Sequence, residues 1–346
     1  MSNRTYTDEE LKAVLAGMGV KDVASAARYG SGHINDTFKV DCASGACYIL
    51  QRINTDIFDP DMVMDNIRRV TEHIRGKGAQ SLEVVAYTNP WRLYAFIKGA
   101  HTVDLITEAG QAFKAAGAFA DFQNALADLP APRLHDIIPN FHNTVSRLGQ
   151  LDAALKADVK GRAATCRPEL DFVDARREEA ARIVNLMASG DIPERITHND
   201  TKINNVMLDD VTGEGTCVID LDTTMPGCAL YDFGDMVRTS TANAAEDEKD
   251  LSKVFSRREY FEQLVRGYLG KAKFLNEAER ENMAFSGRLI TLTIGIRFLT
   301  DYLAGDTYFH TAYDDHNLVR CRTQLKMVKS MEEQSADYEA IVRACR

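Results

Sequence analysis

The most informative stretch of the chain reads Thr197-His198-Asn199-Asp200-Thr201-Lys202-Ile203-Asn204-Asn205-Val206-Met207-Leu208. A turn over residues 209–215 follows, and the chain then continues Cys217-Val218-Ile219-Asp220-Leu221-Asp222. The apolar residues on either side of the turn predict a short hairpin of two strands. Such a hairpin returns the chain beside its starting point, so we expect Asp220 to lie next to Asn205.

These polar residues have the spacing that phosphoryl transfer requires. Asp200 and Asn205 fit the pattern His-x-Asp-x-x-x-x-Asn of a kinase catalytic loop, in which the Asp orients the attacking hydroxyl and accepts its proton. An Asn amide oxygen and the Asp220 carboxylate are suitable ligands for Mg²⁺ on the phosphates of ATP. Lys202 can offset the charge of the phosphate in transfer. Aspartates are common in turns after strands, but three such elements in this order favour a catalytic site.

The composition fits a folded enzyme of two domains or two lobes. The chain has 346 residues, of which 45% are hydrophobic, and this is enough to bury a large core. A formal net charge of -10 makes nucleic acid and anionic membranes unfavourable partners. The 7 cysteines have no zinc-type spacing and are typical of free thiols in a reducing cytosol. We see neither a secretory pattern nor an apolar run of membrane-spanning length, and we expect a cytoplasmic protein of undetermined oligomeric state.

The predicted elements change in character near residue 98. A capping box of Thr7 and Glu10 begins a first helix, and Asp59-Pro60 begins a second one over residues 60–76. Short strands are expected at 37–40, 48–50, 82–87 and 92–97. Further helices are expected at 104–127, 168–188, 258–269, 276–304 and 316–340, with one β-rich patch at 195–221. This order predicts an α+β fold with a small sheet lobe and a larger helical lobe.

At the catalytic stretch the chain resembles the aminoglycoside phosphotransferase/choline kinase superfamily, and as a whole it is more closely similar to the N-acetylhexosamine 1-kinases. The stretches typical of the narrower family are Met225-Pro226-Gly227, Glu246-Asp247-Glu248-Lys249 and Arg297-Phe298-Leu299. The resemblance covers almost the whole chain and implies a protein-kinase-like fold of two lobes. Residues 1–98 would form the nucleotide-binding lobe with its antiparallel sheet. Residues 99–346 would form the helical lobe with the catalytic loop and the sugar site.

The same resemblance assigns roles to the acidic residues of the second half. It implies that Asp200 is the catalytic base and that Asn205 and Asp220 hold Mg²⁺. Asp222 is a candidate for a second metal ligand or for a group on the phosphate side. Two further carboxylates, Asp232 and Asp235, would brace the catalytic loop through hydrogen bonds.

A nucleotide loop is expected in Gly30-Ser31-Gly32-His33-Ile34-Asn35. The segment has the first two glycines of a glycine-rich phosphate loop, and Asn35 stands at the third glycine position. Its place before the strand at 37–40 supports the assignment. Gly30, Gly32 and Asn35 are therefore predicted to bind ATP.

The strand after this loop departs from the pattern of related kinases. A Lys or Arg pairs with the α- and β-phosphates in those enzymes, whereas this position holds Gln51 here. Alternation along the strand turns the adjacent Arg52 to the opposite face. Either Gln51 contacts phosphate as a neutral donor, or a slip in register lets Arg52 serve. In the joint after the last strand, Ala95 and Ile97 are predicted to offer backbone groups to adenine.

The acceptor would lie beside Asp200. The resemblance assigns His33 and Arg297 to a sugar, with Asp301 one turn further along the same helix. A neutral N-acetyl sugar needs hydrogen-bond donors and acceptors together with apolar contact for its methyl group. Two simpler interpretations stay open: a spacing of four residues permits an ion pair between Arg297 and Asp301, and His33 can be a solvated loop residue.

Three functions remain possible at this point. The resemblance implies transfer of phosphate from ATP to the anomeric hydroxyl of N-acetylglucosamine or N-acetylgalactosamine, without preference between them. An anomeric hydroxyl is more acidic than an ordinary alcohol, so a carboxylate of normal pKa suffices as its base. The alternatives are a kinase for an aminoglycoside, choline, homoserine or methylthioribose, and a non-catalytic nucleotide-binding pseudokinase. Gln51 supports the pseudokinase, and the intact catalytic residues oppose it.

Overall fold

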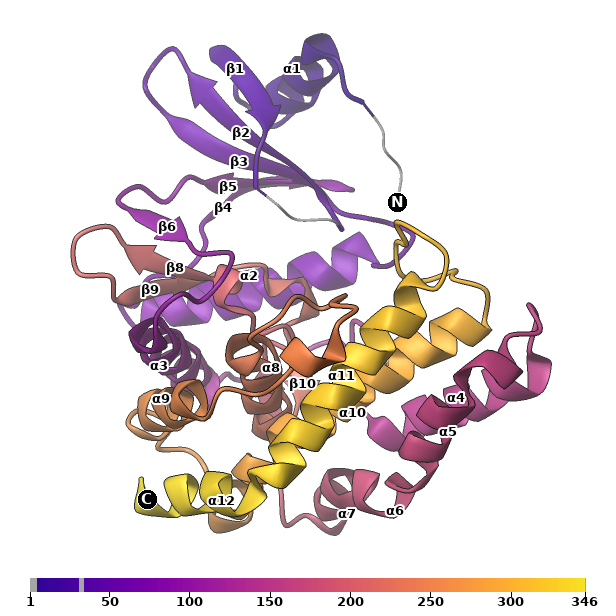
Figure 1. Cartoon of the computed structure of the whole chain (residues 1–346). Coiled ribbons are helices and arrows are strands. Elements are labelled where there is room, and N and C mark those ends of the chain that lie inside the picture. Colours follow the sequence, from indigo (N-terminus) through magenta and orange to yellow (C-terminus); the bar gives the residue numbers. More distant parts are fainter. Residues whose placement is uncertain (1–4, 31–33, 346) are drawn as a thin grey trace.

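The N-terminal part of the chain forms an antiparallel sheet of five strands (Figure 1). The computed structural model describes residues 5–30 and 34–345. The strands are β1 (Val23–Arg28), β2 (Asp36–Cys42), β3 (Cys47–Arg52), β4 (Val84–Thr88) and β5 (Trp91–Ala95). They lie in the order β1-β2-β3-β5-β4, so β3 pairs with β5 at the centre of the sheet. The hairpin predicted around residues 37–50 is confirmed as β2 and β3.

Helix α1 (Asp8–Gly17) covers the outer face of this sheet (Figure 1). Its buried leucines pack with Leu50 of β3 and Leu93 of β5 in a separate small core. Because side chains alternate along a strand, the adjacent Gln51 and Arg92 point to the opposite, inner face. The sheet therefore presents polar side chains toward the helical part of the molecule.

Helix α2 (Pro60–Gly76) lies on the inner side of the sheet (Figure 1). It has the predicted bounds, with Asp59 as its N-cap. The predicted buried face, which includes Val63 and Ile67, packs into the same core as the helical lobe. This shared core joins the two parts, and the boundary at residue 98 stays a prediction.

The C-terminal part is mainly helical. The longer helices are α3 (Ala109–Leu126), α4 (Thr144–Ala157), α8 (Ala229–Thr241), α9 (Arg258–Leu269), α10 (Glu277–Leu303), α11 (His316–Glu333) and α12 (Ser335–Ala344). Helix α10 runs through this part and packs against α4, α8 and α11 (Figure 1). The α+β fold with a small sheet lobe and a large helical lobe is confirmed, with 51% helix and 14% strand.

Two small sheets carry the segment that the sequence singles out. Strands β6 (Ala100–Thr102), β8 (Val206–Asp209) and β9 (Gly215–Val218) form one, and β7 (Arg195–Thr197) and β10 (Met225–Gly227) form the other. Val206 of β8 lies opposite Val218 of β9 in an antiparallel register. The predicted hairpin is confirmed, and its two ends lead into the residues at 205 and 219.

Some predicted helices are wrong in extent. The helix expected at 168–188 is three short ones, α5 (Arg167–Asp174), α6 (Arg177–Ala180) and α7 (Arg182–Ser189). One break falls at Arg176, whose guanidinium binds Glu332 of α11 at 2.7 Å. The helix expected at 316–340 is interrupted at Gln334, which donates a hydrogen bond to the Ser256 carbonyl. Helix α4 and strand β10 were not predicted. Within the described residues, no helix has the length and apolar character needed to cross a bilayer.

Candidate active site

The hairpin brings the predicted catalytic residues together. Lys202 donates to Asp200 Oδ1 at 2.9 Å, and Asn205 Nδ2 donates to Asp200 Oδ2 at 3.1 Å. The backbone N–H of Ile219 donates to the Asn205 carbonyl at 2.9 Å, which places Asp220 next to Asn205. Four of the residues selected from the sequence therefore meet at one point between the lobes.

His198 links the two halves of this group. Its Nδ1 accepts a hydrogen bond from the Asp200 N–H at 3.2 Å, so the ring proton lies on Nε2. Nε2 donates to the Ile219 carbonyl at 2.8 Å. The histidine side chain is fully buried against Phe119 and Phe122. His198 thus holds the catalytic loop against the end of β9, which leads into Asp220.

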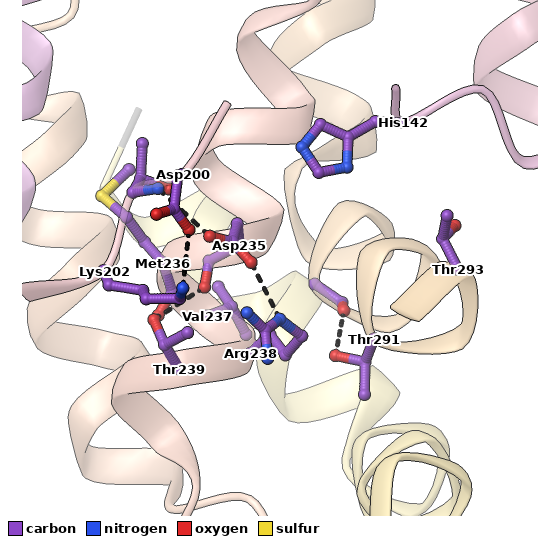
Figure 2. Close-up of polar contacts among 12 residues, drawn as sticks. His142, Asp200, Lys202, Asp235, Met236, Val237, Arg238, Thr239, Thr291 and Thr293 are labelled. Atoms are coloured by element: carbon purple, nitrogen blue, oxygen red, sulfur yellow. Dashed lines mark hydrogen bonds and ion pairs between the residues drawn. The ribbon is translucent and has the colours of Figure 1, made fainter. Parts of the chain in front are cut away.

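Two carboxylates of α8 support the loop from below, as predicted. Asp232 accepts hydrogen bonds from the N–H groups of His198 and Asn199, at 2.8 and 2.7 Å. Asp235 accepts from the Thr201 N–H at 3.1 Å and from Arg238 Nε at 2.8 Å. Figure 2 shows Asp235 beneath Asp200, with Arg238 below Asp235 and bonded to it. The loop is thus fixed by backbone hydrogen bonds on both sides of Asp200.

The electrostatics suit a base at Asp200. Burial works to raise the pKa of Asp200, but the Lys202 ammonium outweighs it and holds that pKa below its usual value. The carboxylate is therefore ionised at neutral pH. Because the Asp200 side chain keeps 29% of its exposure, an acceptor hydroxyl can reach it.

Asp220 has the features of a cation ligand. Its backbone is left-handed, with φ 56°, and its carboxylate accepts no hydrogen bond from the described residues. Although Asp220 is exposed to solvent, desolvation by neighbouring atoms and repulsion from the carboxylates of Asp222 and Asp200 raise its pKa to about 7. A Mg²⁺ ion would relieve this repulsion, and Asn205, Asp220 and Asp222 offer the oxygen ligands that it prefers.

A metal held this way would rely on phosphate and water for the rest of its shell. No group of three or more His, Cys, Asp or Glu arranged around a metal position occurs in residues 5–30 and 34–345. Magnesium is commonly bound by one or two carboxylates together with substrate phosphates, so the residues present fit that ion. The metal assignment of Asn205, Asp220 and Asp222 stays a prediction.

The donor end of the site comprises Asn35, Gln51, Arg92, Asp220 and Asp222. Asp222 is 3% exposed and binds Arg92 Nη1 at 2.5 Å through one oxygen and Asn35 Nδ2 at 2.6 Å through the other. Gln51 accepts from Arg92 Nε at 2.9 Å. Two segments of the sheet lobe thus contact one aspartate of the helical lobe, and Gln51 is linked to it through Arg92. The sequence pattern missed Arg92.

The rest of the predicted nucleotide site is only partly described. Gly30 has φ +79°, a backbone conformation that glycine adopts without strain. Gly32 and His33 lie outside the described residues. At the joint between the lobes, the Ala95 N–H donates to the Glu83 carbonyl at 3.0 Å, whereas the Ile97 N–H forms no hydrogen bond with a described residue. Ile97 is therefore the better placed of the two to donate to adenine.

Five residues around Arg297, the predicted acceptor ligand, form the candidate acceptor end: Phe141, His142, Arg147, Arg297 and Tyr308. His142 Nε2 donates to the carbonyl of the residue before Asp200 at 2.9 Å, which ties this group to the catalytic loop. Arg297 lies over the Phe141 ring at 4.9 Å and the Tyr308 ring at 5.6 Å. Arg147 donates to the Phe141 carbonyl at 2.8 Å. Within the described part of the chain, neither arginine forms an ion pair with a carboxylate.

Neither guanidinium of the acceptor end is therefore paired directly with a carboxylate among the described residues, although the charge of Asp235 acts on Arg297. Burial and the charge of Arg297 lower the pKa of Arg147 to about 10. Burial also lowers the pKa of Arg297, and the nearby Arg238 adds to this effect. Two partly buried guanidinium groups in mutual range are suited to an oxygen-rich partner.

The alternative ion pair between Arg297 and Asp301 is wrong for this structure. Asp301 is 4% exposed, and its oxygens accept hydrogen bonds from the N–H groups of residues 307–309 and from Asn317 Nδ2. The carboxylate thus shapes the loop that carries Tyr308. A direct contact between Asp301 and a substrate stays a prediction.

Comparison with known proteins decides the family. The model of the phosphotransferase enzyme family matches residues 25–275, which is more than half of the chain. The chain belongs to this family. Its hairpin, catalytic loop and donor end lie within the matched segment, whereas Arg297 and Tyr308 of the acceptor end lie beyond it.

Solved structures share the fold at low sequence identity. The choline kinase LicA from Streptococcus pneumoniae has 13% identity and a TM-score of 0.60, covering 94% of this chain and 99% of that one. An aminoglycoside phosphotransferase solved with ADP, APH(2'')-Ib, has 16% identity and a TM-score of 0.56, covering 94% and 99%. A Plasmodium vivax ethanolamine kinase has 14% identity and a TM-score of 0.57, covering 92% and 90%. These likenesses concern the fold alone.

Proposed function

We propose that the chain transfers the γ-phosphate of ATP to the anomeric hydroxyl of N-acetylhexosamines, giving the sugar 1-phosphate and ADP. Membership of the phosphotransferase family supports the reaction class. The resemblance of the whole sequence to N-acetylhexosamine 1-kinases supports the acceptor. The charge of the acceptor end is the structural observation that carries the choice.

Arg147 and Arg297 make a cationic acceptor unfavourable. Kinases with fully cationic acceptors need carboxylates around the ammonium groups, whereas these two guanidinium groups lack carboxylate partners among the described residues. A neutral sugar with an acetamido carbonyl offers oxygen acceptors to both arginines. The rings of Phe141 and Tyr308 would contact its apolar atoms.

The chemistry then rests on one base. Asp200 is ionised, partly exposed and fixed by the hydrogen bonds around it, so it can orient the attacking hydroxyl and accept its proton. Lys202 lies at 2.9 Å from the carboxylate and can offset charge on the phosphate in transfer. An anomeric hydroxyl is already acidic, so this arrangement needs no second base.

ATP and Mg²⁺ are the implied co-substrate and cofactor. Two proteins of the same fold were solved with ADP or with AMP-PNP and Ca²⁺, which supports a nucleotide at the corresponding place here. The residues that would hold the metal are Asn205, Asp220 and Asp222. Bound there, Mg²⁺ would neutralise charge on the nucleotide phosphates.

An assay of ADP release over a panel of acceptors tests the proposal. We expect turnover with N-acetylglucosamine or N-acetylgalactosamine and none with the corresponding 1-O-methyl glycosides, which keep every other hydroxyl. Phosphorylation of the methyl glycosides at the rate of the free sugars would exclude the anomeric position. Turnover with an aminoglycoside, choline, homoserine or methylthioribose instead would replace the acceptor, and no turnover at all would favour a pseudokinase.

A further inference from the structure

A row of three polar side chains crosses the inner face of the sheet. Gln51 of β3 lies opposite Thr37 of β2 on one side and opposite Arg92 of β5 on the other. Gln51 Nε2 donates to Thr37 Oγ1 at 3.0 Å, and Arg92 Nε donates to Gln51 Oε1 at 2.9 Å. Both polar atoms of the Gln51 amide are therefore engaged within the sheet. The row ends in the Arg92 guanidinium, which reaches across to the helical lobe.

Arg92 is a buried cation next to the candidate metal ligands. The side chain is 1% exposed and binds Asp222 Oδ1 at 2.5 Å. The charge of Arg92 also works to lower the pKa of Asp220, which lies two residues before Asp222 in the chain. A fully buried ion pair gains little net stability because both charges lose their hydration, so its presence needs another explanation. The two hydrogen bonds to Gln51 and Asp222 use two of the five guanidinium N–H groups.

Neither candidate in β3 supplies a cation at this point. Arg52 follows Gln51 in β3 and lies opposite Trp91, so alternation turns its side chain toward the α1 side of the sheet. Gln51 carries no charge. A cation that serves the nucleotide phosphates from the sheet must therefore come from a neighbouring strand. Lys39 of β2 shares the inner face but pairs with Asp41 at 3.3 Å, whereas Arg92 of β5 occupies the cross-strand position beside Gln51.

We propose that Arg92 is the phosphate-binding cation of the nucleotide site, and that the Asp222 carboxylate holds its guanidinium in place for a phosphate oxygen. A planar guanidinium is suited to this task because it binds a carboxylate and a phosphate through separate N–H groups. Gln51 then contributes by fixing Nε, not by contacting phosphate. The inference concerns the donor end and holds for any acceptor.

Nucleotide binding without an acceptor tests this assignment. Arg92→Met keeps much of the side-chain length and removes the charge, while Arg92→Lys keeps the charge. With Mg²⁺ present, we expect calorimetry to show Kd for ADP and ATP raised roughly 10- to 100-fold in Arg92→Met, as for loss of a charged hydrogen bond. Adenosine, which has no phosphate, should bind as tightly as in the parent protein, and Arg92→Lys should recover part of the loss.

A second pair of variants keeps the test decisive if Arg92→Met folds poorly with Asp222 left unpaired. Asp222→Asn alone retains the Arg92 cation, and the double variant Arg92→Met/Asp222→Asn lacks it without burying a lone carboxylate. We expect the ratio of the Kd for ADP to that for adenosine to be about 10-fold or more higher in the double variant than in Asp222→Asn. Equal ratios would overturn the proposal and leave Arg92 as a structural residue.

Arg52→Gln is the matched control on the opposite face of the same strand. It should leave the affinities for ADP and adenosine unchanged. A selective loss of ADP affinity in Arg52→Gln, with none in Arg92→Met, would also overturn the proposal and assign the phosphate contact to Arg52. Because no sugar is present, these outcomes do not depend on which acceptor the enzyme uses.

Discussion

The arginines at the two ends of the site differ in their burial and in their hydrogen-bond partners. At the donor end, Arg92 is fully buried and has a carboxylate and an amide oxygen within hydrogen-bonding distance. At the acceptor end, Arg147 and Arg297 are partly buried, contact aromatic rings and backbone, and have no carboxylate partner among the described residues.

This difference indicates which ligand each end is prepared to receive. The donor end pairs Arg92 with Asp222 but leaves the Asp220 carboxylate without a hydrogen bond from the described residues, so it suits a nucleotide that brings a cation with it. The acceptor end carries an excess of positive charge, which a neutral but oxygen-rich molecule can satisfy through hydrogen bonds. Asp200 lies between the two ends, where its N–H donates to His198 Nδ1 and its carboxylate accepts from Asn205 Nδ2.

Asp200→Asn should have the largest effect. The amide has nearly the same shape and cannot accept the proton, so we expect kcat to fall by roughly 10²–10⁴-fold, the usual contribution of a positioned general base. Steady-state kinetics and nucleotide titration would measure it, with Kd for ADP nearly unchanged. Asp337→Asn, an exposed carboxylate on α12, serves as the control. A kcat within about threefold of the parent would remove Asp200 from the chemistry.

Substitution of an arginine at the acceptor end should have a smaller effect, confined to the binding of the sugar. Arg297→Gln should raise KM for the sugar roughly 10- to 100-fold, as for loss of a charged hydrogen bond, without changing Kd for ADP. Arg147→Gln should act in the same direction but less, since Arg147 also supports the Phe141 backbone. Arg280→Gln, at the start of α10, is the matched control. Loss of ADP affinity in Arg297→Gln would contradict the division into two ends.

Much of this site could be predicted from local sequence. The capping box and Asp59-Pro60 define α1 and α2 through contacts within one turn, and the hairpin follows from apolar runs around a turn. The loop spacing then places Asp200 and Asn205 together, because a few residues of chain fix their separation. These features depend on neighbours in sequence, and sequence patterns describe such neighbours well.

The residues that were missed depend on distant contacts. Arg92 meets Asp222 across 130 positions, and nothing near Arg92 in the sequence indicates that partner. A charged residue beside the buried Leu93 in a strand was the available signal, but alternation alone gives its face and not its contact. The continuous helix expected at 168–188 fails similarly, because Arg176 pairs with Glu332 from another helix. His142 and Arg147 belong to the acceptor end through tertiary packing alone.

His142 offers the mildest test, because it reports on the charge of the acceptor end through stability. Its ring is 4% exposed, and Nδ1 has no hydrogen-bond partner among the described residues. Burial lowers its pKa from 6.5 to about 4, and the charges of Arg297 and Arg147 add to the effect. Between these values the unfolded chain binds a proton that the folded protein does not. Stability is therefore complete above about pH 6.5 and falls as the pH is lowered toward 4.

By this linkage, the contribution of His142 should lower the free energy of unfolding by about 2 kcal/mol between pH 7 and pH 5. Urea unfolding at the two pH values would measure the difference in the parent and in His142→Gln, whose amide can still donate to the Asn199 carbonyl. The variant should lose less stability on acidification than the parent, whereas the exposed His310→Gln should leave the difference unchanged. An identical pH dependence in His142→Gln and the parent would mean that the pKa of the ring is the same in the folded and unfolded protein, so that the folded ring is protonated at pH 5. In that case the acceptor end would carry a third positive charge at pH 5, and neither burial nor the charges of Arg297 and Arg147 would disfavour it.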